Sequence, residues 1–320
     1  MRQVIIDTDP GTDDSLAILL ALSQPDIGVL GLTTVQGNQS LDQINANATS
    51  LVNYLGLNTP VYPGSAYTSQ NPVIKASQRQ SYHGGGGMGT LDLPANKAIL
   101  AEESAVDFII RAVKANPKKV DILTLGPLTN LGRCLEKEPD LVNNLGQVYS
   151  MGGGIHKGKL TPVTEFNYGY DAQSAQNAYQ QIGPQNPITM CGLDASYQAV
   201  FTPEIIGKIE QNFPKLARLF HALFDGQIKT YQERESLPGC VIHDVMAFMV
   251  YYDPDFVEEA PLTAMTIVTD SDLVQGLCVA DLEGRFDQVT NARVVMKINR
   301  DRYFNQLMEA FSNLEAKLPT

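Results

Sequence analysis

Short runs of β-branched residues alternate with longer segments of helical period along most of this chain of 320 residues. Such runs predict buried strands, and the longer segments predict helices. Repeated strand–helix units build a mostly parallel sheet covered by helices. The predicted strands are Val4 to Asp7, Val29 to Val35, Val120 to Leu125, Gln147 to Met151 and Ile188 to Leu193. We therefore expect an α/β fold whose functional residues lie along one edge of the sheet.

The pattern changes after Val257. Two or three strands are predicted there, within Leu262 to Val268, Leu273 to Val279 and Val289 to Ile298, before an amphipathic helix from about Tyr303 to Leu318. We interpret this region as a C-terminal addition to the same core. Upstream, Ser104 and Asp171 are predicted to be helix N-caps, because their side-chain oxygens can accept hydrogen bonds from the first turn.

Composition excludes several classes of protein. The chain has 23 Lys and Arg against 35 Asp and Glu, a formal net charge of −12, which argues against a nucleic-acid-binding surface. No run approaches the roughly 20 apolar residues that span a bilayer. The first residues lack the apolar core of a secretory signal, so we expect a cytosolic protein with no membrane partner. The four cysteines show no disulfide or metal-binding spacing and are expected to be free thiols.

Four carboxylates lie within eight residues at the end of the first predicted strand: Asp7, Asp9, Asp13 and Asp14. Their repulsion would destabilise the loop unless a positive charge lies there, and a helix N-terminus supplies only about half a charge. A bound cation would balance them. A tight turn with only oxygen ligands suits Ca²⁺ or Mg²⁺ better than zinc. The alternative is a solvated acidic turn in which Asp13 caps the following helix.

Polar groups also follow the other predicted strands. Asn38 comes after the second strand, Leu125 ends the third and could aim its carbonyl at a cation, and Glu165 and Asn167 lie beyond the fourth. Since the carboxyl ends of parallel strands meet at one sheet edge, these groups are expected to converge. A carboxylate, two amides and a cation are what a vicinal diol such as ribose needs for recognition. Taken singly, a loop-capping role is the commoner one for each residue.

Two histidines are further candidates. His243 and Asp244 open the apolar helical stretch Val245 to Tyr252. His243 is either an ordinary partly buried histidine or a general acid, and Asp244 is either a plain N-cap or a further metal ligand. His83 lies in a Gly-rich loop within Ser65 to Glu103, a stretch without regular patterning, and could contact a ligand as part of a lid.

The segment Asp7-Thr8-Asp9-Pro10-Gly11-Thr12-Asp13-Asp14 resembles the signature of the calcium-dependent nucleoside hydrolases, the inosine-uridine preferring group and its relatives. Further segments resemble family motifs in the same order, namely Val35-Gln36-Gly37-Asn38, His83 with Gly87-Met88-Gly89-Thr90, Gly126-Pro127-Leu128-Thr129-Asn130, Met151-Gly152-Gly153-Gly154, Glu165-Phe166-Asn167 and His243-Asp244. The resemblance covers nearly the whole chain. It implies a single domain over residues 1–320 with an open sheet of Rossmann-like type, and hydrolysis of the N-glycosidic bond of ribonucleosides to free base and ribose.

The resemblance implies roles by position. The implied ligands of Ca²⁺ are Asp9, Asp14, the Leu125 carbonyl and Asp244. The implied contacts to the substrate are Asp13, Asn38, His83, Glu165 and Asn167. Asp9 would take the proton of the attacking water, and His243 would protonate the departing base, which the oxocarbenium-like transition state of glycosyl cleavage leaves electron-rich. By the same resemblance we expect a homodimer or homotetramer.

Two departures from the family bear on the substrate. In the loop where the family often has an Asn for the ribose 5′-hydroxyl, this chain reads Lys157-Gly158-Lys159-Leu160. Lys159 either replaces that contact or faces solvent, and it is left out of the predicted site. The chain has no Trp, so a base cannot be held between tryptophans as in purine-specific members. Gln227 and Tyr231 lie one turn apart on a predicted helix and are expected to meet the base, unless they are surface residues. Because Gln both donates and accepts, we expect a preference for pyrimidine ribonucleosides, with inosine as a further candidate.

Two other functions stay open at this point. A non-catalytic ribose- or nucleoside-binding protein would use the same scaffold and bind without turnover. A phosphatase of the haloacid dehalogenase type is suggested by Asp7-Thr8-Asp9, although that family wants a Thr two residues after the second Asp, where this chain has Gly11.

Overall fold

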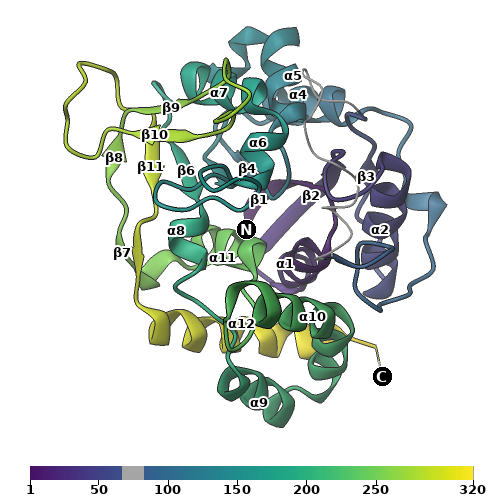
Figure 1. Ribbon diagram of the computed structural model, residues 1–320. Helices are drawn as coiled ribbons and strands as arrows, with labels where there is room; N and C mark the ends of the chain where they lie inside the picture. Colours follow the sequence, from purple (N-terminus) through teal and green to yellow (C-terminus); the bar gives the residue numbers. More distant parts are fainter. Residues whose placement is uncertain (67–82, 320) are drawn as a thin grey trace.

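The computed structural model describes residues 1–66 and 83–319. Its centre is an eight-stranded sheet in the order β3-β2-β1-β4-β5-β6-β11-β8 (Figure 1). These strands are β1 (Arg2–Thr8), β2 (Ile27–Thr34), β3 (Val61–Tyr62), β4 (Val120–Thr124), β5 (Val148–Met151), β6 (Ile188–Cys191), β8 (Leu262–Thr263) and β11 (Ala292–Val294). All neighbours are parallel except β11 and β8. The predicted α/β fold with a mostly parallel sheet is confirmed.

Helices cover both faces of the sheet, and each face has its own hydrophobic core. Successive residues of a strand point to opposite faces, so Val4 and Ile6 belong to one core and Ile5 to the other. On the Ile5 side lie α4 (Ala105–Ala115), α5 (Thr129–Lys137) and α7 (Ala172–Gln181). On the other side lie α1 (Thr12–Ser23), α2 (Leu41–Tyr54), α8 (Leu193–Ser196), α9 (Pro203–Asn212), α10 (Pro214–Glu235), α11 (His243–Tyr252) and α12 (Arg300–Lys317). In Figure 1, α4, α5 and α7 lie at the top of the view, and α9, α10 and α12 lie at the bottom.

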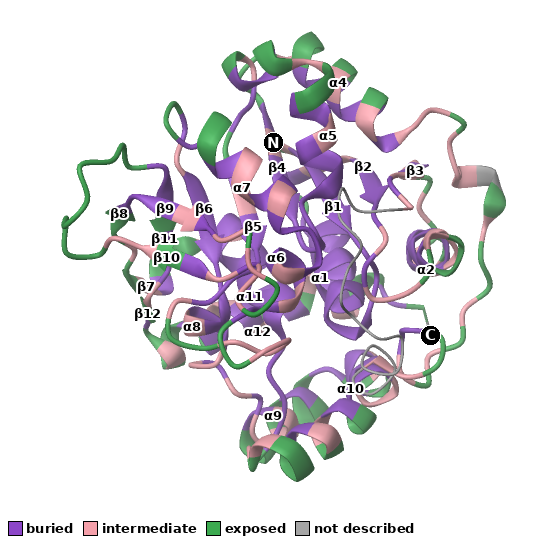
Figure 2. Ribbon diagram, turned by 45° about the horizontal axis from the view of Figure 1, so that its top comes forward, coloured by how far each residue is buried: buried purple, intermediate pink, exposed green. Residues whose placement is uncertain are grey.

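Two helices, α1 and α11, are buried almost throughout. Both are apolar around most of their circumference, and such helices are stable only inside a core. α11 packs against α1, β4 and β5, and Figure 2 shows α1 and α11 among the buried elements. The polar residues at their N-terminal ends are therefore held inside the protein.

The order of the strands positions a binding site. From β1 the chain runs outward to β2 and β3, and then returns to the other side of β1 and continues through β4, β5 and β6. In open α/β sheets, ligands bind outside the carboxyl ends of the strands at such a reversal. Asp9 follows β1 and Leu125 follows β4, so both residues lie at this point.

The C-terminal region differs in detail from the prediction. Instead of two or three long strands it has six short ones, which are β8, β11, β7 (Val257–Glu259), β9 (Met265–Ile267), β10 (Cys278–Ala280) and β12 (Lys297–Ile298). β11 extends the main sheet beside β6, β9 pairs with β10, and β12 pairs with β7. The predicted runs break where the chain changes its pairing partner, at Ala264 and at 295–296, which residue periodicity does not reveal. The shared sheet confirms an addition to the same core.

Several local predictions can also be compared with the structure. Ser104 and Asp171 are N-caps, because Ser104 Oγ accepts from Asp107 N and Asp171 Oδ1 accepts from Ser174 N. Within the predicted irregular stretch, residues 67–82 lie outside the described residues, and η1 (Lys97–Ile99) is a short 3₁₀ turn. Across residues 1–66 and 83–319, no helix combines the length and apolarity needed to cross a membrane.

Candidate active site

Four acidic side chains meet at the carboxyl end of the sheet: Asp9, Asp13, Asp14 and Asp244. None is more than 5% exposed. Carboxylate oxygens of Asp13, Asp14 and Asp244 lie within 4.8 Å of one another. Asp9 is close enough that the charge on Asp14 acts on it. The predicted convergence of the first loop with the start of α11 is therefore present in the fold.

Burial disfavours the ionised form of these carboxyl groups. It raises the pKa of Asp9 and of Asp244 well above the usual range, and the charge on Asp14 raises both further. Burial, together with the charge on Asp13, also raises the pKa of Asp14. Carboxylates in a poorly solvated interior repel one another strongly. A cation among them would offset that repulsion.

The alternatives in which Asp13 or Asp244 is the N-cap of its helix are wrong. The N-cap of α1 is Gly11, whose N–H donates to Asp14 Oδ2 at 3.0 Å, so Asp13 lies within the first turn. The N-cap of α11 is Ile242, so Asp244 is likewise inside its helix. Neither Asp13 nor Asp244 is therefore explained by capping.

Asp9 is oriented by its neighbours and keeps one oxygen unpaired. Its Oδ2 accepts a hydrogen bond from Asn38 N at 2.6 Å. Its Oδ1 is buried, and no donor among the described residues reaches it. Gly37 and Gly126 pack against the carboxylate; a Cβ on Gly37 would overlap Oδ2, and one on Gly126 would lie 2.5 Å from Oδ1. The two glycines therefore form a cradle that admits the carboxylate and little else.

The donor set fits a hard divalent cation. It is buried and offers oxygen alone, which suits Ca²⁺ or Mg²⁺. Oδ1 of Asp9 has no hydrogen-bond partner in the part of the chain that the structure describes. The carbonyl of Leu125, a predicted ligand, accepts from Asn167 Nδ2 at 2.7 Å. A carbonyl oxygen has two lone pairs, so this contact leaves one for a cation.

The predicted ribose-binding residues also hold the loops of the site together. Asn38 Nδ2 donates to the Asp9 carbonyl at 3.1 Å and to Asp14 Oδ2 at 3.3 Å. Glu165 caps α6 (Phe166–Tyr170), and its two oxygens accept from Asn167 N at 2.9 Å and Gly153 N at 2.8 Å. Burial raises the pKa of Glu165, against the effect of these hydrogen bonds.

His83 brings its Gly-rich loop onto the first turn of α1. Its Nδ1 accepts from Thr12 N at 3.2 Å and lies 3.6 Å from Asp13 Oδ1. Burial lowers the pKa of His83, against the opposing charge of Asp13. The structure thus places the predicted lid residue beside the acidic cluster.

A second polar cluster adjoins the first through the neighbours His243 and Asp244. His243 Nε2 lies 2.9 Å from Lys159 Nζ and 2.9 Å from Tyr231 OH, and Lys159 Nζ donates to Tyr231 OH at 2.7 Å. The other ring nitrogen, Nδ1, is 2.8 Å from Ser196 Oγ. Burial and the charge of Lys159 lower the pKa of His243 well below its usual range.

Gln227 is a buried amide on α10. It is 1% exposed, and neither its Oε1 nor its Nε2 has a hydrogen-bond partner among the described residues. It precedes Tyr231 by one turn on the same face of α10. Because Tyr231 is also buried, the alternative that these are surface residues is wrong.

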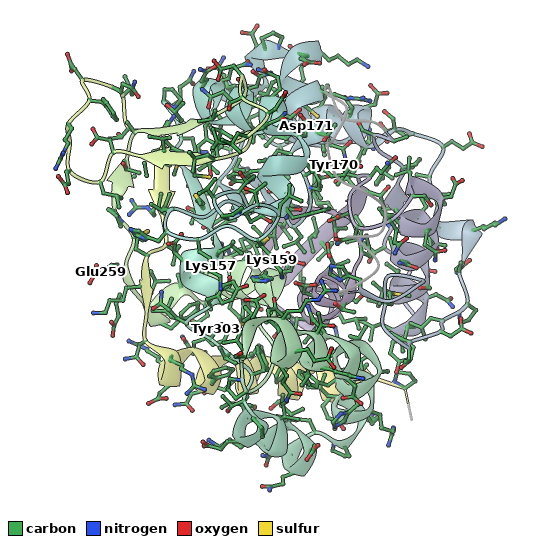
Figure 3. The ribbon with its side chains drawn as sticks, viewed as in Figure 1. Lys157, Lys159, Tyr170, Asp171, Glu259 and Tyr303 are labelled. Carbon is green, nitrogen blue, oxygen red and sulfur yellow. The ribbon has the colours of Figure 1, made fainter. Side chains whose placement is uncertain are left out.

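The sequence reading missed Lys159 and Ser196. Lys159 lies six residues before Glu165 in the loop after β5, and that shared loop is a signal that could have favoured it over solvent exposure. Figure 3 shows Lys159 with Lys157 in this loop. Ser196 lies at the end of α8 in no recognisable motif, so only the packing of α8 on α11 reveals it.

Comparisons with known proteins agree with this geometry. The family model described as inosine-uridine preferring nucleoside hydrolase matches residues 4–305. The inosine-uridine preferring nucleoside hydrolase of Crithidia fasciculata is 31% identical over 319 residues, 98% of each chain. The pyrimidine-specific ribonucleoside hydrolase RihB of Escherichia coli is 29% identical over 311 residues, 96% of each chain. A solved purine-preferring ribonucleoside hydrolase from Gardnerella vaginalis has a TM-score of 0.88 at 29% identity, and the match covers 98% of this chain and 99% of that one.

These matches span nearly the whole chain, and they set aside the phosphatase alternative, which rested on Asp7-Thr8-Asp9 with Thr12 nearby. They agree with the resemblance carried by the Asp-rich loop and the motifs that follow it. The chain belongs to the family of inosine-uridine preferring nucleoside hydrolases and is an enzyme that cleaves the N-glycosidic bond of nucleosides.

Proposed function

We propose that this protein hydrolyses ribonucleosides to free base and ribose in a Ca²⁺-dependent reaction. The observation that carries the proposal is the buried group of Asp9, Asp13, Asp14 and Asp244, in which one oxygen of Asp9 has no partner among the described residues. Asp9, Asp14, Asp244 and the carbonyl of Leu125 would hold the cation. When bound, Ca²⁺ supplies a positive charge that lowers the pKa of water and orients the ribose diol.

Asp9 is the proposed base. Asn38 N fixes its Oδ2, and Gly37 and Gly126 restrict the carboxylate from both sides. This leaves Oδ1 to take a proton from the water that attacks C1′. A fixed acceptor avoids the cost of ordering the carboxylate during the reaction.

The ribose lies among carboxylates and amides in this proposal. Asp13, Asn38, Glu165 and Asn167 would bind its hydroxyls, with His83 at the same edge of the cluster. As the bond to the base breaks, positive charge develops on the sugar ring, and nearby anionic oxygens stabilise it. The hydrogen bonds of Glu165 to three backbone N–H groups keep that carboxylate in one orientation.

His243 is the proposed proton donor to the base, with Tyr231 and Gln227 beside it. The low pKa of His243 makes its protonated form a strong acid, as a poor leaving group requires. Names of relatives do not decide the base, because RihB is called pyrimidine-specific and the Gardnerella enzyme purine-preferring. We propose a pyrimidine preference because the amide of Gln227, which has no partner within residues 1–66 and 83–319, can both donate to and accept from a pyrimidine edge.

A reducing-sugar assay tests the proposal. The substrates are uridine, cytidine, inosine, adenosine and 2′-deoxyuridine, before chelation, after exhaustive chelation and after Ca²⁺ is restored. We expect ribose release that disappears with chelator, returns with Ca²⁺, fails on the deoxy substrate and is fastest with uridine or cytidine. Uridine binding without ribose release would favour the non-catalytic alternative. Sedimentation velocity tests the expected homodimer or homotetramer.

A further inference from the structure

Three polar side chains from separate parts of the chain close a triangle beside the acidic cluster. Lys159 comes from the loop between β5 and α6, Tyr231 from α10 and His243 from the start of α11. The three edges are 2.7 Å, 2.9 Å and 2.9 Å between Nζ, OH and Nε2. All three groups are within hydrogen-bond distance of one another, so a change in charge on one is felt by the other two.

The chemistry of lysine settles the direction of two of these contacts. An ammonium group has donors and no acceptor. Lys159 therefore donates to the hydroxyl oxygen of Tyr231 and to Nε2 of His243. Lys159 thus donates hydrogen bonds to Tyr231 and His243, which face the leaving base in the proposed function. It also places a positive charge beside them.

The loop that carries Lys159 is anchored, which keeps the ammonium in place. The N–H groups of Lys159 and Leu160 both donate to Thr164 O at 2.9 Å. Two residues earlier, Lys157 Nζ lies 3.2 Å from Glu235 Oε2 and 3.2 Å from the centre of the Tyr197 ring (Figure 3). The loop is thus attached to α10 at two points, one exposed and one buried.

Nearby acids help to keep this partly buried lysine charged. Burial lowers the pKa of Lys159, while the charges of Asp13 and Glu235 oppose that shift. The ammonium group is within hydrogen-bond distance of Tyr231 OH and His243 Nε2. The positive charge therefore lies beside the two residues that are proposed to face the base.

We propose that Lys159 assists departure of the base, acting through His243 and Tyr231 to stabilise the negative charge that forms on the base. This inference rests on the proposed function. In that step the electron pair of the C1′–N bond passes to the base nitrogen, which takes a proton from the imidazolium form of His243. Nε2 of His243 then has the free lone pair that accepts the hydrogen bond from Lys159. The water oxygen bonds to C1′, and its proton goes to Asp9. Lys159 is a positioning residue in this step, because it stabilises the negative charge on the base nitrogen until the proton arrives. Lys159 itself neither gains nor loses a proton.

The test compares two substrates with different leaving groups. Uridine needs stabilisation of its departing base, whereas p-nitrophenyl riboside releases a nitrophenolate that needs little. Lys159→Met keeps the apolar stem and removes the charge. We expect kcat on uridine to fall about 10²- to 10³-fold, which is the loss that enzymes show when one preorganised hydrogen-bond donor to a developing negative charge is removed. On the nitrophenyl substrate we expect a loss below about tenfold, with KM for both substrates nearly unchanged.

Matched variants separate this role from a structural one. Lys157→Met alters the same loop at its exposed anchor and should leave the ratio of the two activities unchanged. Lys159→Arg retains a cationic donor and should recover part of the uridine activity. His243→Ala should show the same substrate dependence as Lys159→Met. The double variant should lose no more than the larger single loss, because the two residues act as one unit.

Two results would overturn the inference while leaving the proposed function intact. One is an equal loss on both substrates for Lys159→Met, which marks a structural role. The other is unchanged uridine hydrolysis. If Lys159→Met does not fold, Lys159→Gln is compared with Lys159→Arg by the same ratio, and equal ratios overturn the inference. Failure of the proposed function is distinct, because the wild-type protein would then release no ribose from any nucleoside.

Discussion

Replacing Asp244 by Asn is expected to stabilise the metal-free protein and to weaken its stabilisation by Ca²⁺. Asp244 is buried, and its carboxylate lies within 4.8 Å of the carboxylate oxygens of Asp13 and Asp14. Asn has nearly the same shape as Asp and no charge. The substitution therefore removes electrostatic repulsion and leaves the packing at the start of α11 largely unchanged.

The size of the effect follows from the distances in the cluster. At 4.8 Å and an effective dielectric constant of about 20, two full charges repel by about 3.5 kcal/mol. Without a cation the carboxyl groups are partly protonated, because burial raises the pKa of Asp14 and of Asp244. We therefore expect a gain of about 1 to 3 kcal/mol, within the usual range for one substitution. For 320 residues this raises Tm by about 1.5 to 4.5 °C.

Thermal unfolding with chelator and with saturating Ca²⁺ measures both effects. In the wild-type protein, Ca²⁺ at a hundred times its Kd should add about 2.7 kcal/mol, and in Asp244→Asn this gain should fall by more than half. The control is Asp171→Asn. Asp171 is a buried N-cap of α7 that accepts from Thr129 Oγ1 at 2.7 Å and Ser174 N at 3.1 Å. This variant should lose the same Tm in both conditions, because neither Asp171 nor its partners Thr129 and Ser174 are proposed ligands of the cation.

Two outcomes would refute the reasoning about Asp244. A lower Tm of Asp244→Asn in chelator would mean that repulsion among these carboxylates does not destabilise the fold. An undiminished Ca²⁺ shift would mean that Asp244 does not hold the cation.

Two further predictions concern Gly37, which packs against the carboxylate of Asp9, and Gln227, which is proposed to contact the base. Gly37→Ala places a methyl group on the carboxylate of Asp9 and should lower kcat about 10²-fold, whereas Gly207→Ala, where a Cβ meets nothing within 4 Å, should leave kcat unchanged. Equal kcat values in the ribose-release assay would contradict the role of Asp9. Gln227→Met removes two buried polar atoms that lack partners among the described residues, so Tm should rise while KM for uridine rises about tenfold. An unchanged KM would mean that the base does not contact Gln227.

The central strands were predictable because they are buried on both faces. Such strands read as continuous apolar runs in sequence, so β1, β4 and β6 begin and end within two residues of the prediction. The edge of the sheet was harder to predict. β3 has only two residues, Val61 and Tyr62, and so short a strand has no periodicity to detect.

The residues of the site also differ in how far the sequence predicts that they meet. Asp9, Asp13 and Asp14 are close in space because they are close in sequence, at a turn between a strand and a helix. Asp244 joins them from more than 200 residues away, because α11 is apolar and must pack in the core beside α1. The family motifs in the sequence suggested that Asp244 lies near the first loop, and the packing of the buried helices α1 and α11 places it there.

The sequence by itself determined the type of fold, the acidic loop and the polar residues at the strand ends, because those features arise from local periodicity and strand direction. Only the tertiary structure decided where long side chains on loops and helix faces end up. Lys159 was equally compatible with solvent and with the site until the anchored loop placed it against His243. Gln227 was compatible with a surface until the packing of α10 buried it. Both outcomes depend on contacts between residues distant in sequence, which no local pattern of residues encodes.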